Sequence, residues 1–367
     1  MGSIYLLDLT EDLKPKGEPR PLTPLKSYLL GLAWTPDGRD IIFSFGFMAD
    51  MSLWKVSAFA AGEPEPLPVT GEYPTISRSG NRLAYQRAVC DTNIWRLSLS
   101  APGVAAGDPS RFIASTRAEQ SAQYSPDGKR IAFESRRSGP LGIWVSDADG
   151  SNAQQLFSRS GKDCGNPNWS PDGQRIAFYS NLEGNIHIYI IRASGGKPVR
   201  LTVGSSEDYG PSWSRDGNWV YFASNRTGRL EVWKVPSGGG KEIQVTRNGG
   251  ETALESPDGK SIYYTKEYPS LGLWKMPLSG GEESQVLPSV LGSDFSLVKE
   301  GIYFIPGPPL RKSSVQFLSF ATGEVKTVAP MSAPSFGGLS FSPDGPSLLF
   351  SQLDDVVSDL MLVENFR

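Results

Sequence analysis

The chain consists of short runs in which apolar and polar residues alternate, and these runs recur in the same order along its length. Alternation with a period of two is typical of a β-strand that buries one face. Seven such runs carry two apolar side chains two positions apart, at Ile41/Phe43, Leu83/Tyr85, Ile131/Phe133, Ile176/Phe178, Val220/Phe222, Ile262/Tyr264 and Leu348/Phe350. The pattern therefore predicts one strand type that is repeated through the whole sequence.

A short polar turn precedes each of these strands and occurs once more, at Lys299-Glu300-Gly301. The turns are Pro36-Asp37-Gly38, Arg78-Ser79-Gly80, Pro126-Asp127-Gly128, Pro171-Asp172-Gly173, Arg215-Asp216-Gly217, Pro257-Asp258-Gly259, Lys299-Glu300-Gly301 and Pro343-Asp344-Gly345. Proline presets φ, aspartate bonds nearby backbone and glycine accepts a positive φ, so each turn should close a hairpin. The turn glycines are 42 to 48 residues apart, a period typical of four-stranded propeller blades.

The remaining strands of the unit can be placed around this hairpin. An aromatic residue lies four positions before the turn glycine in five repeats, a third strand carries an apolar-aromatic pair such as Ile143-Trp144, and a weaker fourth strand includes Leu201-Thr202. We therefore predict an all-β fold, an eight-bladed β-propeller of four-stranded antiparallel blades, with seven or nine blades as alternatives. Residues 1–367 form one predicted domain, with helix nearly absent.

When the strands are counted by their place in the repeat, one strand of the third type is in excess. The chain opens with third and fourth strands, at Ser3 to Thr23, and ends with a first, a second and a third strand, the last at Leu360 to Val363. Either the last blade is closed by the amino-terminal fourth strand, with one segment displaced, or an upstream strand pair is absent. We favour the second possibility and expect a fragment of a longer protein.

Two segments, Tyr124 to Leu156 and Trp169 to Thr202, resemble the WD40-like repeats of TolB-type bacterial propellers, with the pattern WSPDG-K-RIAF-S … IWVSDADGSN … LT. This resemblance implies a binding propeller. The repeat serves in periplasmic TolB, in the gating propeller of prolyl peptidases and in the sensor half of CadC-like membrane regulators. It also implies a periplasmic or other extracytoplasmic location, although the sequence itself shows no targeting signal.

Composition narrows the classes of partner. The 40 glycines, 29 prolines and 11% aromatic residues favour short strands and tight turns. A net charge of −3 without a basic stripe argues against nucleic acid as a partner. No apolar run reaches the roughly 18 residues that span a bilayer, so we expect no direct membrane insertion.

The sequence contains few residue groups that are typical of catalytic or metal sites. His187, the one histidine, lies in an alternating strand, where packing between blades or exposure to solvent is the expected role. No Gly-x-Ser-x-Gly motif occurs, and Gly238-Gly239-Gly240-Lys241 is followed by Glu242 where a phosphate loop needs serine or threonine. Cys90 and Cys164 are isolated, and we expect both to be unpaired. We predict no enzyme activity, no cofactor and no metal.

The repeat does place a candidate binding surface. Connections from fourth to first strands and loops from second to third strands should meet at one rim, around the mouth of the central channel. A protein or peptide partner, or a small polar ligand, should bind there through an inner ring and a basic rim. The inner ring is Glu72, Tyr73, Gln120, Asp208, Tyr209, Glu251 and Asp294, and the rim partners are Arg136 and Arg226.

The leading hypothesis is a noncatalytic binding module, the extracytoplasmic sensor or interaction domain of a larger bacterial protein. One alternative is a propeller lyase or glycosidase that uses channel carboxylates such as Glu72, Asp208 and Glu251, since paired carboxylates can perform acid-base catalysis. Another is a purely structural scaffold, whose channel mouth would be filled by its own side chains.

Overall fold

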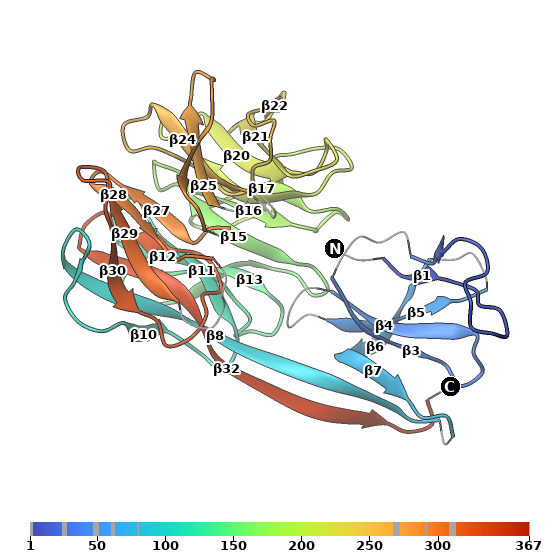
Figure 1. Ribbon diagram of the computed structural model, residues 1–367. Coiled ribbons are helices and arrows are strands. Elements are labelled where there is room, and N and C mark those ends of the chain that lie inside the picture. Colours follow the sequence, from blue (N-terminus) through green and yellow to red (C-terminus); the bar gives the residue numbers. More distant parts are fainter. Residues whose placement is uncertain are drawn as a thin grey trace. The chain divides into compact units, whose positions relative to one another are not determined.

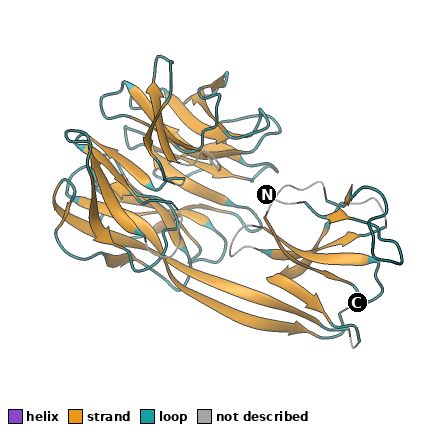
Figure 2. Ribbon diagram, viewed as in Figure 1, coloured by secondary structure: helices purple, strands orange, loops and turns teal. Residues whose placement is uncertain are grey.

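A computed structural model describes residues 3–23, 28–46, 51–59, 63–79, 81–266, 272–290, 292–307 and 313–366. Its regular structure is entirely β, as predicted (Figure 2). The chain divides into two compact units: unit 1 comprises Met1–Cys90 and Asp355–Arg367, and unit 2 comprises Asp91–Asp354. In the described ranges, no helix is long and apolar enough to cross a membrane.

Five regular sheets follow one another along unit 2, each with four antiparallel strands in chain order. The first two are β11 (Glu119–Tyr124), β12 (Arg130–Ser135), β13 (Gly142–Asp147) and β14 (Gln154–Ser158), then β15 (Cys164–Trp169), β16 (Arg175–Ser180), β17 (His187–Arg192) and β18 (Val199–Arg200). The third is β19 (Asp208–Trp213), β20 (Trp219–Ser224), β21 (Glu231–Pro236) and β22 (Ile243–Gln244). The last two are β23 (Ala253–Glu255), β24 (Ser261–Lys266), β25 (Gly272–Pro277) and β26 (Ser284–Leu287), then β27 (Phe295–Val298), β28 (Gly301–Phe304), β29 (Ser314–Ser319) and β30 (Val325–Pro330).

The predicted turns close the first hairpin of these sheets, and a side-chain cap explains their composition. Ser125 donates a hydrogen bond of 2.6 Å to Asp127, whose carboxylate also accepts the backbone N–H of Lys129 at 3.2 Å. The hydroxyl bond is the main cause of the lowered pKa of Asp127. The same hydroxyl-to-aspartate bond recurs at Thr35/Asp37, Ser170/Asp172, Ser214/Asp216 and Ser256/Asp258.

Unit 1 contains one complete sheet of the same kind, formed by β3 (Tyr28–Trp34), β4 (Asp40–Gly46), β5 (Ser52–Ser57) and β6 (Glu65–Thr70). A short pair, β1 (Tyr5–Leu6) and β2 (Arg20–Pro21), precedes it as expected for a third and a fourth strand. Ile4 and Leu22 pack against Phe43 in one hydrophobic cluster. The turn after β7 (Glu72–Ile76) includes Gly80, which lies outside the described residues.

Two long strands connect the remaining repeats. β8 (Leu83–Ala101) and β32 (Ser347–Val363) each run through what should be a second strand, a loop and a third strand, and they pair with one another (Figure 1). In regular sheets this loop turns at a glycine with positive φ, such as Gly139, Gly184 or Gly228. Neither 87–92 nor 352–358 contains a glycine, so both segments continue as strand without this turn.

The sixth sheet of unit 2 is therefore composite. β31 (Ser340–Phe341) and the start of β32 supply its first two strands, and residues from 91 of β8 with β10 (Ser110–Ile113) supply the other two. A small hairpin strand, β9 (Val104–Ala105), pairs with the end of β8. The N–H of Leu99 donates to the carbonyl of Pro346 at 2.6 Å, which connects the two halves.

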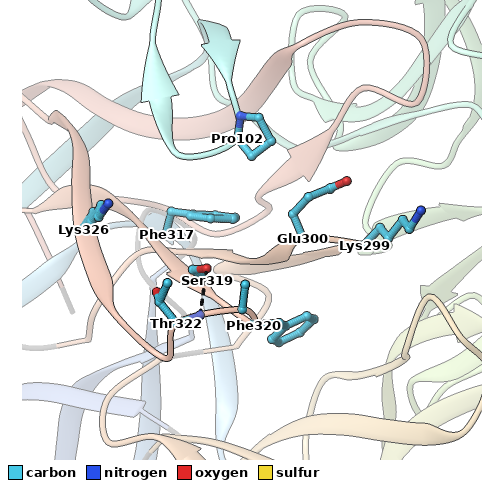
Figure 3. A pocket seen from close by; sticks show the side chains of 9 residues that line it. Pro102, Lys299, Glu300, Phe317, Ser319, Phe320, Thr322 and Lys326 are labelled. Carbon is cyan, nitrogen blue, oxygen red and sulfur yellow. Dashed lines mark hydrogen bonds between the residues drawn. The ribbon is translucent and has the colours of Figure 1, made fainter.

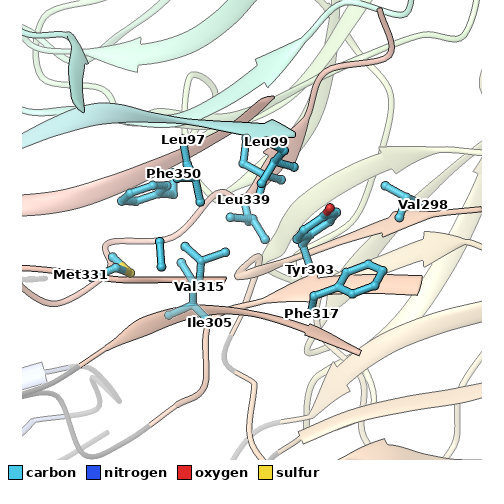
Figure 4. Close-up of a cluster of buried hydrophobic side chains, with 12 residues drawn as sticks. Leu97, Leu99, Val298, Tyr303, Ile305, Val315, Phe317, Met331, Leu339 and Phe350 are labelled. Carbon is cyan, nitrogen blue, oxygen red and sulfur yellow. The ribbon is translucent and has the colours of Figure 1, made fainter. Parts of the chain in front are cut away.

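A shared hydrophobic core holds the composite sheet against its neighbour. Leu97 and Leu99 of β8 lie beside Phe350 of β32, and all three pack with Tyr303 and Phe317 of the β27–β30 sheet (Figure 4). These side chains are at least nine-tenths buried. Burying a leucine or phenylalanine side chain contributes about 1.5–3 kcal/mol, so the two halves are strongly joined.

Hydrogen bonds and close packing then close unit 2 into a ring of six sheets. The N–H of Tyr124 in β11 donates to Ser340 in β31 at 3.2 Å, and that of Phe341 donates to Ser296 in β27 at 3.3 Å. At Gly338, a Cβ atom would lie 2.6 Å from the Cα of Ser121, so only glycine fits this approach.

The prediction of eight separate four-stranded blades needs correction. The described part of the chain has six four-stranded sheets, one six-stranded sheet and one two-stranded pair, because the repeats that start at β7 and β31 share a sheet. The surplus third strand, Leu360 to Val363, is the end of β32, and in unit 1 it packs with Leu83 and Tyr85 of β8. The physical reason is the missing glycine turn in both repeats, which the strand count did not consider.

Candidate functional site

One cavity of about 120 Å³, here called the central cavity, is lined by the first strand or its lead-in in all six sheets of unit 2. Its lining residues lie four to eight positions before each turn glycine. The convergence of six strands on one small space is the geometry that the repeat predicts for a propeller axis. Unit 2 thus presents one cavity to which every one of its sheets contributes.

A bulge in the first strand aims these residues at the cavity. Ser121, Asn166 and Gly210, each seven positions before its turn glycine, have φ values of 52°, 48° and 55°. The strand registers shift at the same places. Left-handed backbone at a serine or asparagine costs about 1–3 kcal/mol and persists only when its surroundings fix it.

Hydroxyl and amide side chains provide the polar chemistry of the central cavity. Five serines, one threonine, two asparagines and one glutamine line it, and no aspartate, glutamate, lysine or arginine does so among the described residues. Phe295, Phe341, Leu254 and Leu339 add apolar surface. Such a lining can donate and accept hydrogen bonds to a polar backbone, but it contains no group that titrates near neutral pH.

Tryptophan residues hold neighbouring first strands at a fixed spacing. Trp169 Nε1 donates to the carbonyl of Gln123 at 3.2 Å, and Trp213 Nε1 donates to the carbonyl of Asn168 at 3.1 Å. Arg175 covers the Trp213 ring at 4.6 Å from its centroid. At Trp169 and Trp213, the aromatic residue four positions before the turn glycine therefore fixes the wall of the cavity without lining it.

Two of the predicted site residues, Asp208 and Arg226, form an ion pair inside a sheet. Asp208 is fully buried, and Arg226 Nη2 donates to it at 3.0 Å. The guanidinium stacks on Trp233 at 4.6 Å and also lies over Phe222. His187 Nδ1 lies 3.4 Å from the same carboxylate, while Arg200 donates to His187 Nε2 at 2.7 Å.

An equivalent pair occurs two sheets earlier. Glu119 lies nine positions before its turn glycine, as Asp208 does, and Arg137 lies nine positions after it, as Arg226 does. Arg137 lies 3.5 Å from the buried Glu119 carboxylate and covers Phe133 and Trp144. Burial raises the pKa of Glu119. The recurrence favours a structural role for both pairs, joining the first strand to the loop after the second.

None of the other predicted residues of unit 2 lines the central cavity, although four of them are next to a lining residue in the sequence: Gln120, Tyr209, Glu251 and Asp294. Gln120 is half-buried and donates to Thr92 at 3.2 Å, and Tyr209 donates to Glu207 at 3.4 Å. Glu251 and Arg136 are half-buried. Asp294 is buried and accepts a hydrogen bond from Ser335 at 3.0 Å, and burial raises its pKa to about 7.

Two predicted residues belong to unit 1. Glu72 is half-buried, and burial raises its pKa. Tyr73 is half exposed and has a φ of 51°, and a Cβ atom on Gly31 would lie 2.7 Å from its Cα. Gly31 and Tyr73 thus pack as Gly338 and Ser121 do in unit 2. The same bulge joins neighbouring first strands in both units.

The thiols of Cys90 and Cys164 are free, as predicted. Cys164 is buried, and its Sγ lies 3.4 Å from the carbonyl of Leu141. Among the described residues, no group of three or more histidine, cysteine, aspartate or glutamate side chains could hold a metal ion.

Sequence reasoning missed one buried carboxylate beside the cavity wall. Glu134 accepts the backbone N–H of Asn166 at 2.6 Å, and Asn166 Nδ2 donates to Ser121 at 3.3 Å. Burial raises the pKa of Glu134. This contact holds the left-handed bulge of β15 against β12. The available signal was a glutamate six positions after the turn glycine, where the other repeats have serine, tyrosine, alanine, threonine, glutamine or glycine.

Comparison with known proteins agrees with this geometry. TolB, a Tol-Pal system protein of Anaeromyxobacter dehalogenans (strain 2CP-C), is 28% identical over 161 residues, which are 44% of this chain and 26% of that protein. A crystal structure of TolB from Acinetobacter baumannii superposes with a TM-score of 0.52 at 18% identity, over 74% of this chain and 66% of that one. The chain thus spans part of each TolB protein.

The fold is shared with an enzyme as well. A gluconolactonase from Xanthomonas campestris superposes with a TM-score of 0.52 at 15% identity, over 72% of this chain and 97% of that one. At this identity the likeness concerns the fold alone. The model of the family described as PD40, TolB beta propeller domain, matches residues 121–305, half of the chain. The chain therefore belongs to the PD40 family of TolB β-propeller domains.

Proposed function

We propose that this chain is a noncatalytic protein-binding module and that its partner docks on the face of unit 2 around the mouth of the central cavity. The observation that carries the proposal is the lining of that cavity. Six strands present nine hydroxyl or amide side chains to one space, with no charged residue among the described lining residues. Such groups suit recognition of a peptide backbone or a small polar ligand.

The predicted residues around this space supply the proposed periphery of the site. Gln120, Tyr209 and Glu251 would contact the partner, while Asp294 and the Asp208–Arg226 pair would hold the strands that carry them. Arg136 remains a proposed rim partner for an anionic group. Glu72 and Tyr73 would act in unit 1, at the equivalent positions of its own repeat. Both units, built from one series of eight repeats, would serve as one module of a larger extracytoplasmic bacterial protein.

The curated relative is a Tol-Pal system protein, which favours an interaction module. The enzyme alternative has less support, although a gluconolactonase shares the fold. The enzyme alternative relied on Glu72, Asp208 and Glu251. Asp208 is paired with Arg226, and no carboxylate is among the described residues that line the central cavity. A glycosidase needs two carboxyl groups that face one substrate.

The proposal can be tested without knowing the partner, by selecting binders from a random peptide library displayed on phage. Ser212→Phe should fill the central cavity, and we expect it to lower the affinity of selected peptides at least about tenfold, since a clash removes buried hydrogen bonds. Asp172→Asn, on the turn face, is the matched control. If the selected peptides bind Ser212→Phe with unchanged affinity but bind Asp172→Asn more weakly, the site lies on the opposite face.

A further inference from the structure

A second cavity of about 570 Å³ lies in unit 2, away from the central cavity (Figure 3). Three segments that are distant in sequence form it: the turn before β9 at Pro102, the turn between β27 and β28 at Lys299 and Glu300, and residues 317–326 of β29, β30 and their connection. This volume is within the range of small-molecule sites, about 300–1,000 Å³.

The cavity lies where two features depart from the repeat. The turn Lys299-Glu300-Gly301 has no hydroxyl-to-aspartate cap, so it presents two long charged side chains where five of the other repeats have a compact proline-aspartate turn. The β8–β9 hairpin adds Pro102-Gly103, whose Gly103 N–H donates to Tyr303 Oη at 2.8 Å. A Cβ atom on Gly103 would lie 2.6 Å from the Phe317 ring, so only glycine permits this approach.

The floor of the cavity is aromatic and rigid. Phe317 is 5% exposed and packs on Tyr303 with ring centroids 4.6 Å apart. In Figure 3, Pro102 lies across the cavity from Phe317. Phe320, which is 44% exposed, lines the same cavity. A flat apolar ring would bury its faces between such walls, where aromatic pairs gain about 0.5–1.5 kcal/mol beyond burial.

Positive charge flanks this apolar floor. Lys299 and Lys326 lie on opposite sides of Phe317 in the view of Figure 3. Within the described ranges, Lys299 has no ion-pair partner, and Lys326 has only Glu324, 4.0 Å away and equally exposed. Exposed pairs of this kind are weak, so an incoming anion can compete for Lys326. With Glu300 as the one acidic lining residue, the cavity is cationic overall.

We propose that this cavity binds an aromatic carboxylate, with the ring against Phe317 and the carboxylate on Lys299 or Lys326. Ser319 and Thr322 would add hydroxyl donors at the edge. The same chemistry could come from a free aromatic acid or from the carboxyl-terminal phenylalanine of a peptide. The site is separate from the central cavity, so it does not depend on the function proposed above.

Isothermal titration calorimetry with four probes tests this assignment: 3-phenylpropionate, its neutral amide, the peptide Ala-Ala-Phe and its carboxyl-terminal amide. We expect at least one acid to bind in the millimolar range or tighter, and its amide to bind at least about tenfold more weakly because the charge-assisted bond is lost. Binding of 3-phenylpropionate alone identifies a free acid as the source. Binding of Ala-Ala-Phe alone identifies a peptide end.

Two variants locate the binding. Lys299→Gln with Lys326→Gln should weaken the acid at least about tenfold, and Ala321→Trp should block the cavity sterically. All three positions are exposed, and unchanged thermal unfolding will show that the variants fold. Lys129→Gln with Lys275→Gln is the matched control on other sheets. The proposal is overturned if neither acid binds, if the amides bind equally well, or if the lysine pair and Ala321→Trp leave affinity unchanged.

Discussion

At the scale of single residues, buried charge is the feature with the clearest consequences. Asp294 has its pKa raised from an ordinary 3.8 to about 7 by burial. Unfolded aspartate ionises near 3.9, so ionisation favours the unfolded chain as pH rises from about 4 to 7. The stabilising contribution of the neutral carboxyl is complete below pH 4 and is lost above pH 7.

We therefore predict that Asp294→Asn increases stability at pH 8 but not at pH 4. Three units of pKa correspond to about 4 kcal/mol, which is the upper limit of the gain. The amide oxygen can still accept the hydrogen bond from Ser335. Chemical denaturation of both proteins at the two pH values will measure the difference, and a gain that does not depend on pH would show that folding does not raise the pKa of Asp294.

A second residue-scale prediction concerns the buried ion pair. Asp208→Ala should lower the free energy of unfolding by about 1.5–3 kcal/mol, because it removes a buried charge-assisted hydrogen bond from Arg226 and leaves Glu242 as the remaining carboxylate partner of that guanidinium. The double variant Asp208→Ala, Arg226→Ala should lose less than the sum of the two single losses. Additive losses in urea denaturation would mean that the two groups are independent.

At the scale of elements, the sequence predicted the hairpins correctly and the cavity lining incompletely. The turn signals gave each first and second strand, because their residue preferences act locally. The bulge seven positions before the turn glycine was not expected, and it brings Ser121 and Asn166 to the cavity while Asp208 turns into its sheet. Serine carries no strong signal for left-handed backbone, and asparagine carries only a statistical preference that does not locate a bulge. Glu134 holds one such bulge from a different sheet.

The close approach between first strands gives an element-scale prediction. Gly338 has a φ of 82°, and a Cβ atom there would lie 2.6 Å from the Cα of Ser121. Gly338→Ala should therefore destabilise unit 2 by at least about 1–3 kcal/mol. Gly345→Ala is the control, because nothing lies within 4 Å of a Cβ atom at that position. Equal melting temperatures for the two variants would argue against tight packing between β31 and β11.

At the scale of the whole molecule, the pairing of distant repeats could not be read from the repeat itself. Each of the eight turns indicates a hairpin of first and second strands. A period near 44 residues does not show which third and fourth strands join that hairpin in one sheet. The missing glycines in 87–92 and 352–358 are the local cause, and the burial of Leu97, Leu99 and Phe350 in one core provides the stabilisation. Ring closure is a property of all six sheets, so a count of markers overestimates the number of separate blades.

The composite sheet completes the ring and the central cavity, and cysteine cross-linking tests it most directly. The N–H of Leu99 donates to the carbonyl of Pro346 at 2.6 Å. Standard backbone dimensions then keep the two Cα atoms within about 6.5 Å of one another, which is within reach of a disulfide. With Cys90 and Cys164 changed to serine, Leu99→Cys with Pro346→Cys should give a monomer whose peptides are joined 99 to 346 on mild oxidation, by mass spectrometry. Leu99→Cys with Asp258→Cys should not. Free thiols, or links only between two chains, would contradict closure of unit 2 by its first and last repeats.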